Sequence, residues 1–221
     1  MSKQLIFDCD GVLVDSEIIA AHVMVELLNH HGIPIDVPYY LNYCTGKTFS
    51  GLKKSLSDQY GVALPDDFIP QVTEDMEARV TTSLQPIDGI NEVLLQLSDI
   101  PKAVVSNSDL YQVRDALRIT ELDHFFDHLF SSEQVQNAKP SPDVYLFAAS
   151  ELAVRPDDCL VVEDSVSGAT AAIAAGMNVI GLLAGRHIVD GHVDRLRAVG
   201  VSKFAEDSGE LQRLIHKSMT H

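Results

Sequence analysis

The sequence has no tryptophan, only three cysteines and no apolar stretch long enough to span a membrane. Cys9, Cys44 and Cys159 are odd in number and lack a paired metal-ligand spacing, so we expect reduced thiols rather than disulfides or a zinc site. Residues 1–4 lead directly into an apolar run instead of a secretory segment. These absences predict a cytoplasmic protein with no membrane partner.

Basic side chains are also scarce. The chain has 16 lysines and arginines against 32 acidic residues, a formal net charge of -16. This charge repels nucleic-acid phosphates, so we expect no nucleic-acid partner. An anionic substrate would therefore need a local site, and a metal ion is the simplest way to provide one. For the assembly we expect a monomer or a weak homodimer.

Short apolar runs alternate with helical patterns over most of the 221 residues. This alternation predicts an α/β fold with a doubly wound, Rossmann-like parallel sheet. Only helical patterns occur between residues 17 and 84, so we expect a helical cap domain at 17–84, inserted into a core formed by 1–16 and 85–221. The expected strands are 5–7, 102–105, 128–130, 159–162, 178–183 and, more weakly, 201–204. The expected helices begin at Ser16 as N-cap and continue with 40–44, 49–60, 67–80, 91–97, 110–117, 142–152, 165–175 and 210–216.

Two aspartates, Asp8 and Asp10, follow the first expected strand, and Gly11 lets the chain turn away behind them. Two carboxylates this close resist ionising together unless a cation or hydrogen bonds compensate them. Two interpretations remain open at this point. One is a solvated, Asp-rich turn. The other is a nucleophilic carboxylate on a divalent cation, with its neighbour acting as general acid and base.

Polar residues also follow two other expected strands: Ser106 and Asn107 after the second, and Glu163 and Asp164 after the fourth. Each pair has a local explanation, because the first could cap the next helix and the second favours a helix start. However, the carboxyl ends of the strands border the ligand crevice in such sheets. Carboxylates that converge there need a hard cation, and oxygen ligands suit Mg²⁺. The coincidence therefore predicts a magnesium site.

Two lysines are candidates for substrate contact. Lys139 lies before a helix that begins at Pro142, and it is either a surface lysine or a source of positive charge for a phosphoryl group and its carboxylates. Gly46 and Lys47 lie in a polar turn of the helical section. That turn is either a substrate loop or an ordinary interhelical turn with a solvated lysine.

Three histidines are not expected to bind a metal. His124 and His128 have the four-residue spacing of a helical metal pair, but no third ligand is evident and their acidic neighbours indicate a solvated segment. His22 lies on the mainly apolar face of its helix, so we expect it to be packed or to lie beside the flap of residues 11–15 rather than to bind a metal.

Four motifs, in this order and at these spacings, resemble those of the haloacid dehalogenase superfamily of phosphohydrolases. They are DCDGVLVDS at 8–16, VSN at 105–107, KPSPDVY at 139–145 and VEDSVSG at 162–168. The resemblance covers essentially the whole chain. It is to the branch with a helical cap after the first motif, which contains sugar-phosphate phosphatases, phosphoglycolate phosphatases and beta-phosphoglucomutases.

The resemblance implies roles for the acidic residues. Asp8 would attack phosphorus to form an aspartyl phosphate. Asp10 would protonate the leaving oxygen and later deprotonate the hydrolytic water. Mg²⁺ would be bound by the side chains of Asp8 and Asp164 and by the backbone carbonyl of Asp10, with Glu163 in the outer shell.

The resemblance also implies roles for the other polar residues. Ser106 and the backbone of Asn107 would donate hydrogen bonds to the phosphoryl oxygens. Lys139 would orient Asp8 and neutralise charge. Residues 11–15 would form a flap at the root of the cap, whose closure excludes water.

We therefore expect a Mg²⁺-dependent phosphatase of small phosphorylated metabolites, namely sugar phosphates or sugar-acid phosphates. A phosphomutase is the alternative, but beta-phosphoglucomutases carry a histidine and an arginine where this chain has Ala20 and Phe49. A 2-haloacid dehalogenase would need no Mg²⁺. A non-catalytic binding module would be expected to have lost Asp8, Asp10 or Asp164.

Overall fold

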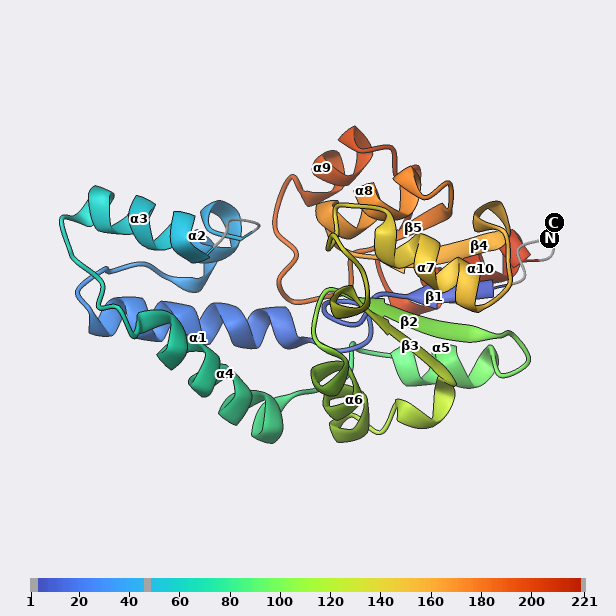
Figure 1. The fold of residues 1–221 in the computed structure, drawn as a ribbon, viewed down its shortest axis with the longest axis horizontal. Coiled ribbons are helices and arrows are strands. Elements are labelled where there is room, and N and C mark those ends of the chain that lie inside the picture. Colours follow the sequence, from blue (N-terminus) through green and yellow to red (C-terminus); the bar gives the residue numbers. More distant parts are fainter. Residues whose placement is uncertain (1–3, 46–48, 220–221) are drawn as a thin grey trace.

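The computed structural model describes residues 4–45 and 49–219. Six strands form one parallel sheet in the order β3-β2-β1-β4-β5-β6. The doubly wound α/β fold predicted from the sequence is confirmed (Figure 1). The strands are β1 (Gln4–Phe7), β2 (Lys102–Ser106), β3 (His128–Ser131), β4 (Cys159–Glu163), β5 (Asn178–Leu182) and β6 (Lys203–Ala205).

Helices alternate with these strands along the core. One helix was not predicted, α9, because it is only seven residues long and buries a single side chain, Leu196. The core helices are α5 (Ile90–Gln96), α6 (Leu110–Ile119), α7 (Asp143–Glu151), α8 (Val166–Ala174), α9 (His192–Ala198) and α10 (Ser208–Met219), and the 3-10 turns are η1 (Asp123–Phe125), η2 (Ser132–Gln134) and η3 (Pro156–Asp158).

The sheet is buried on both faces, as expected for parallel strands. Successive side chains of a strand point to opposite faces. Leu5 and Phe7 of β1 therefore enter one apolar cluster with α5, α6 and α10, whereas Ile6 enters a second cluster with α7, α8 and α9. Apolar side chains fill both clusters, so the polar residues that follow the strands lie at the ends of the sheet and not on its faces.

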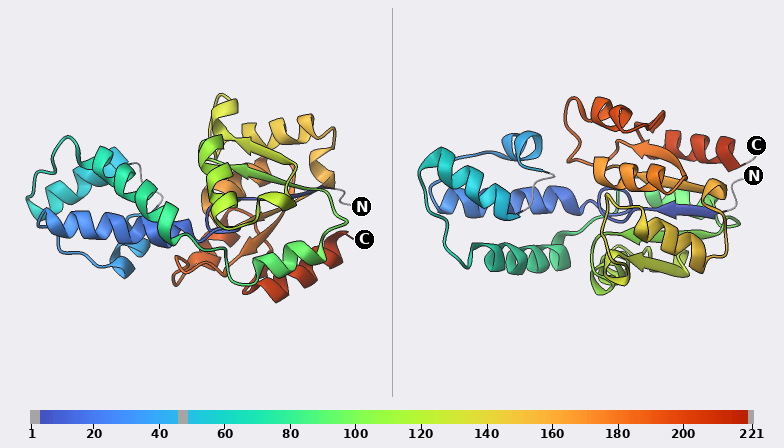
Figure 2. Two further views of the ribbon diagram at one scale, coloured as in Figure 1. Left: turned by 90° about the horizontal axis from the view of Figure 1, so that it is seen from below. Right: turned by 45° about the horizontal axis from the view of Figure 1, so that its top comes forward.

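Between β1 and α5 the described residues form four helices and no strand, and these helices lie together beyond the end of β1 (Figures 1 and 2). This is the helical cap. Within the cap, α1 packs most extensively on α4, and α2 also packs on α1. The cap helices are α1 (Ser16–His30), α2 (Val37–Tyr43), α3 (Phe49–Tyr60) and α4 (Phe68–Ser83).

The two segments that join the cap to the core lie side by side. The backbone N–H of Asp15 donates to the carbonyl of Gln85 at 2.9 Å, and the N–H of Ile87 donates to the carbonyl of Leu13 at 3.0 Å. Val14 also forms an isolated bridge with Pro86. We call these two paired segments, 13–15 and 85–87, the hinge.

The structure corrects two local expectations about α1. Ser16 is the first helical residue rather than the N-cap, which is Asp15, because the Ser16 hydroxyl is engaged elsewhere. His22 is exposed rather than packed. No helix within residues 4–45 or 49–219 is both long and apolar enough to cross a membrane.

Candidate active site

The register of the central strands brings three acidic side chains together. Phe7 of β1 lies beside Val162 of β4, so Asp8, which follows Phe7, comes close to the end of β4. Asp8, Glu163 and Asp164 are all buried and each offers one carboxylate oxygen within 4.8 Å of the others. Residues that are 155 positions apart in sequence therefore form one acidic cluster at the carboxyl end of the sheet.

Lys139 is a buried lysine, not a surface one, and its side chain is 3% exposed. Its Nζ lies 2.7 Å from Asp8 Oδ1 and 2.8 Å from Glu163 Oε1, and it also donates to the carbonyl of Val105 at 3.0 Å. Burial disfavours the charged amine, but the two carboxylates outweigh burial and raise the pKa of Lys139 well above its usual range. Lys139 is therefore a fixed positive charge inside the cluster.

The side chain of Asn107 holds the backbone of Lys139. Its Oδ1 accepts from the Lys139 N–H at 2.9 Å, and its Nδ2 donates to the Lys139 carbonyl at 3.3 Å. The Asn107 carbonyl in turn accepts from the Ser132 hydroxyl at 2.8 Å. Asn107 thus connects the end of β2 to the loop that carries Lys139.

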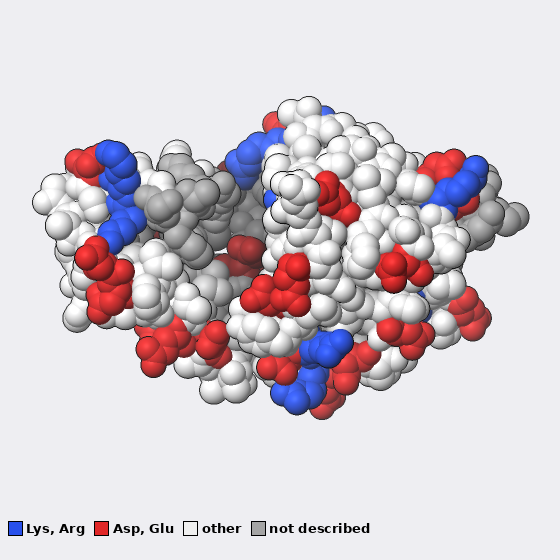
Figure 3. All heavy atoms as spheres, viewed as in Figure 1, with Lys and Arg blue, Asp and Glu red and all other residues white. Residues whose placement is uncertain are grey.

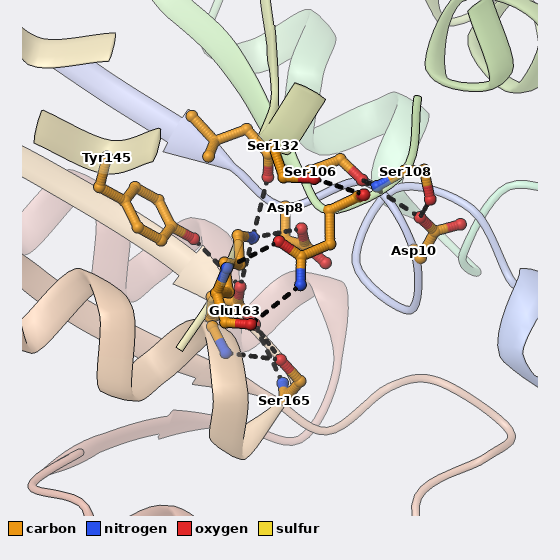
Figure 4. Close-up of polar contacts among 12 residues, drawn as sticks. Asp8, Asp10, Ser106, Ser108, Ser132, Tyr145, Glu163 and Ser165 are labelled. Atoms are coloured by element: carbon orange, nitrogen blue, oxygen red, sulfur yellow. Dashed lines mark hydrogen bonds and ion pairs between the residues drawn. The ribbon is translucent and has the colours of Figure 1, made fainter. Parts of the chain in front are cut away.

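Both oxygens of Glu163 are occupied (Figure 4). Oε1 accepts from Lys139 and from the Tyr145 hydroxyl at 3.0 Å, and Oε2 accepts from the backbone N–H and hydroxyl of Ser165 at 3.0 and 2.9 Å. At Gly168 on α8, a β-carbon would overlap this carboxylate. Neither Tyr145 nor Gly168 was predicted as a site residue, although both lie in the quoted motifs.

Asp10 is held by hydroxyl groups and not by the acidic cluster. Its Oδ1 accepts from Ser16 at 2.6 Å, and its Oδ2 accepts from Ser108 at 2.8 Å and from Ser106 at 3.3 Å. Figure 4 shows Asp10 with Ser106 and Ser108 on one side of Asp8 and Glu163 with Tyr145 on the other. Ser16 and Ser108 were not predicted as site residues, since serine is common at helix starts and in turns.

The cluster fits a hard cation. Burial raises the pKa of Asp8 and of Asp164 well above their usual values, and the neighbouring carboxylates raise both further, with Lys139 opposing the effect. Asp164 Oδ1 is buried and has no hydrogen-bond partner. An unpartnered buried carboxylate oxygen is costly. A divalent ion with oxygen ligands would remove both penalties, as Mg²⁺ does in proteins.

His124 and His128 do not join this site. Gly46 and Lys47 lie outside the described residues. His124 lies in η1 and His128 in β3, both exposed, so they do not share a helix, and the described residues place no third metal-binding group beside them. Figure 3 shows acidic side chains scattered over the visible face of both the cap and the core, in agreement with the acidic composition.

The comparison with known families identifies the fold. Residues 5–182 match the family described as haloacid dehalogenase-like hydrolase. The chain belongs to this family. The resemblance carried by the four motifs is thereby confirmed, and the protein is an enzyme of the hydrolase class.

Similar sequences include enzymes named as phosphatases. The 6-phosphogluconate phosphatase of Escherichia coli (strain K12) is 32% identical over 187 residues, which cover 84% of each chain. The fructose-1-phosphate phosphatase of the same organism is 28% identical over 176 residues, which cover 80% of this chain and 94% of that enzyme.

Two solved structures are similar over nearly their whole length. A haloacid dehalogenase-like protein from Agrobacterium tumefaciens has a TM-score of 0.94 and 33% identity, with both chains fully covered. A family hydrolase from Deinococcus radiodurans, solved with bound phosphate and sodium, has a TM-score of 0.85 and 32% identity over 98% of this chain and 96% of that one.

Proposed function

We propose that this protein is a Mg²⁺-dependent phosphatase that hydrolyses sugar phosphates or sugar-acid phosphates through an aspartyl phosphate on Asp8. The observation that carries the proposal is the buried triangle of Asp8, Lys139 and Glu163 beside an unpartnered oxygen of Asp164. An ionised carboxylate held by a fixed ammonium group is a positioned nucleophile. The names of the similar enzymes support a phosphorylated metabolite as the substrate.

In this proposal Asp8 attacks phosphorus, and Lys139 orients Asp8 and favours its ionised form. Phosphoryl transfer depends mostly on in-line positioning and on stabilising the charge of the transferring group. Lys139 supplies such a charge without moving, because its backbone is held by Asn107 and its Nζ by two carboxylates. The Ser106 hydroxyl and the backbone N–H of Asn107 are the proposed donors to the phosphoryl oxygens.

Asp10 is the proposed general acid and base. It would give a proton to the leaving oxygen and take one from the water that hydrolyses the phospho-enzyme. Its separation from the acidic cluster suits this role, since three hydroxyl donors hold the carboxylate without a second fixed charge in direct contact. Those hydroxyl groups would also fix the direction in which Asp10 faces the substrate.

The proposed holders of Mg²⁺ are the side chains of Asp8 and Asp164 and the backbone carbonyl of Asp10. Glu163 would stay in the outer shell, because both of its oxygens already accept hydrogen bonds. When bound, the ion would neutralise charge on the phosphoryl group and on the carboxylates around it. The ion would also relieve the repulsion that burial imposes on this cluster.

The cap is the proposed source of substrate selectivity. We place its boundaries at residues 17–84, with Gly46 and Lys47 in the loop that reaches the leaving group. A few side chains in such a loop are enough to change which phosphoester is accepted. We propose the location of the protein to be cytoplasmic, where phosphorylated metabolites occur.

The experiment is a phosphate-release assay with purified protein and a panel of phosphate esters, in Mg²⁺ and in EDTA. The panel contains 6-phosphogluconate, fructose 1-phosphate, a hexitol phosphate, a nucleoside monophosphate and p-nitrophenyl phosphate. We expect release from at least one sugar ester in Mg²⁺, loss in EDTA and recovery when Mg²⁺ is restored. Activity that persists in EDTA, or on a 2-haloacid, would contradict the proposal.

A phosphomutase is tested with the same preparation. A sugar 1-phosphate and a bisphosphate primer are supplied, and formation of the 6-phosphate is followed. We expect net release of phosphate rather than isomerisation, because Ala20 has no ionisable group. Conversion to the 6-phosphate without phosphate release would replace the phosphatase proposal with the mutase.

A further inference from the structure

The segment between β5 and α9, residues 183–191, and the first residue of α9 each bring one histidine contact to Asp164. His187 Nε2 lies 2.8 Å from Asp164 Oδ2, and His192 Nε2 lies 2.6 Å from the backbone carbonyl of Asp164. A backbone carbonyl only accepts, so His192 Nε2 carries a proton and donates it. His187 Nε2 donates to Asp164 when that carboxyl is ionised, as it would be on a metal ion. Asp164 is therefore held at its side chain by the segment and at its main chain by the start of α9.

The ring of His187 is wedged in place. Its side chain is 10% exposed, and it packs against the backbones of two glycines. A β-carbon on Gly185 would lie 2.6 Å from His187 Nδ1, and one on Gly11 would lie 2.9 Å from its Cε1 and would overlap Asp164 Oδ2. Gly11 also has a φ of +80°, in the left-handed region that favours glycine. Two glycines thus leave the room that this histidine needs.

The consequence is an asymmetric carboxylate. Oδ2 of Asp164 accepts from His187, whereas Oδ1 is buried and unpartnered. Hydrogen bonds from outside the coordination sphere commonly orient the ligands of a metal ion. Here the hydrogen bond to Oδ2 fixes the carboxylate so that one oxygen alone is left for an ion.

The same segment is anchored to the hinge of the cap. Arg186 Nε pairs with Oδ2 of Asp15, which immediately precedes α1. The Asp15 side chain is 6% exposed and the Arg186 side chain is 62% exposed. Arg186 and His187 are adjacent, so the position of the hinge bears directly on the contact to Asp164.

We propose that His187 is a positioning residue for the magnesium site: it holds Asp164 through Oδ2 so that Oδ1 faces the ion, while Arg186 fixes the segment to the hinge. The inference rests on the proposed function, since it requires that Asp164 bind the metal. It assigns His187 no contact with the ion or the substrate.

The test is calorimetric titration of the full-length protein with Mg²⁺, without substrate. His187→Ala is expected to raise the Mg²⁺ dissociation constant about tenfold or more, the usual effect of losing such a partner. His187→Gln keeps an amide donor of similar reach and is expected to recover most of the affinity. His128→Ala, an exposed histidine on β3, is the matched control and is expected to bind as wild type does.

Activity supplies a second measurement. In His187→Ala the Mg²⁺ concentration for half-maximal rate should rise, while kcat at saturating Mg²⁺ should stay close to wild type. Melting temperatures in EDTA identify a variant that is merely unfolded. If His187→Ala does not fold, Arg186→Ala tests the same segment without a cavity, with an expected weakening of about threefold.

The outcomes separate the two proposals. If wild type binds no Mg²⁺, both the proposed function and this inference fail. If wild type binds Mg²⁺ and neither His187→Ala nor Arg186→Ala binds it more weakly, only the inference fails. If His187→Gln binds as weakly as His187→Ala, the imidazole is itself required and the positioning role is overturned.

Discussion

The carboxyl edge of the sheet and the helical cap hold charged side chains in opposite ways. At the sheet edge, Lys139 and Glu163 form an ion pair with side chains 3% and 0% exposed. In the cap, Lys54 and Asp58 form a pair with side chains 78% and 67% exposed. A buried pair is costly to desolvate and costly to break, whereas an exposed pair contributes little. The difference supports the proposal that the chemistry lies at the sheet edge, and it indicates that the exposed pair in the cap contributes little to stability.

The largest effect that this contrast predicts is on catalysis. Asp8→Asn keeps the size of the side chain but removes the nucleophile, so kcat for phosphate release should fall by at least about 10³-fold. Lys54→Ala, in the cap, should leave kcat unchanged because its partner is a solvated side chain. Steady-state assays of both variants measure the difference. If Asp8→Asn turned over at the normal rate, Asp8 would not be the nucleophile and the acidic cluster would not be the catalytic site.

The next effect is on stability. Lys139→Met leaves two buried carboxylates without their cation, so the free energy of unfolding of the metal-free protein should fall by about 3–5 kcal/mol. Urea denaturation in EDTA measures this loss. Lys54→Met is the matched change in the cap and should leave the unfolding midpoint where it is. Equal losses in the two variants would show that burial is not what separates the two regions.

Two glycine substitutions sharpen the comparison. Gly168→Ala forces Glu163 to move, which should cost about 1–3 kcal/mol and also reduce kcat, since Glu163 holds Lys139. Gly61→Ala in the cap meets no neighbouring atom but has a φ of +67°, so it should cost about 1 kcal/mol of backbone strain and leave kcat intact. Denaturation and activity are measured on each. If Gly61→Ala lowered kcat and Gly168→Ala did not, catalysis would depend on the cap and not on the cluster at the sheet edge.

The last effect depends on pH and arises at the first turn of α1, where the cap meets the core. Burial raises the pKa of Glu17 to about 7, with Asp10 and Asp164 adding to the rise. A raised carboxyl pKa stabilises the folded protein below the unfolded pKa, and this stability is lost as pH rises toward 7. Glu17→Gln should therefore stabilise the metal-free protein at pH 7.5 more than at pH 5. Urea denaturation at both values checks it, and an equal effect at both would contradict the assigned burial.

Most of the fold follows from patterns that lie along the chain. The buried strand of residues 159–162 is a short run of apolar residues, and it is followed by acidic residues and a helix, so both the element and the position of Glu163 were predictable. Asp8 was predictable for the same reason. What the strand pattern does not contain is the register, which decides that Asp8 and Glu163 share Lys139.

The part of the site that was missed depends on contacts between distant segments. His187 lies in a connection with no periodicity, and its only local signal is the pair of glycines at 185 and 191. Ser16 was expected to cap α1, but its hydroxyl is 2.6 Å from Asp10 and serves that carboxylate instead. Helix-capping rules consider only contacts within the local chain, whereas here the Ser16 hydroxyl donates to a carboxylate outside the helix.

The paired segments of the hinge have a consequence for how such an enzyme can change. The chain leaves the sheet at Asp15 and returns at Gln85, and the backbones of these two residues are hydrogen-bonded to each other. The cap is therefore an insertion whose two ends lie side by side. A cap of a different size or fold can be inserted at this point without changing the order or the connections of the strands. The architecture therefore allows the cap to be exchanged or resized while the sheet and the residues at its edge are kept.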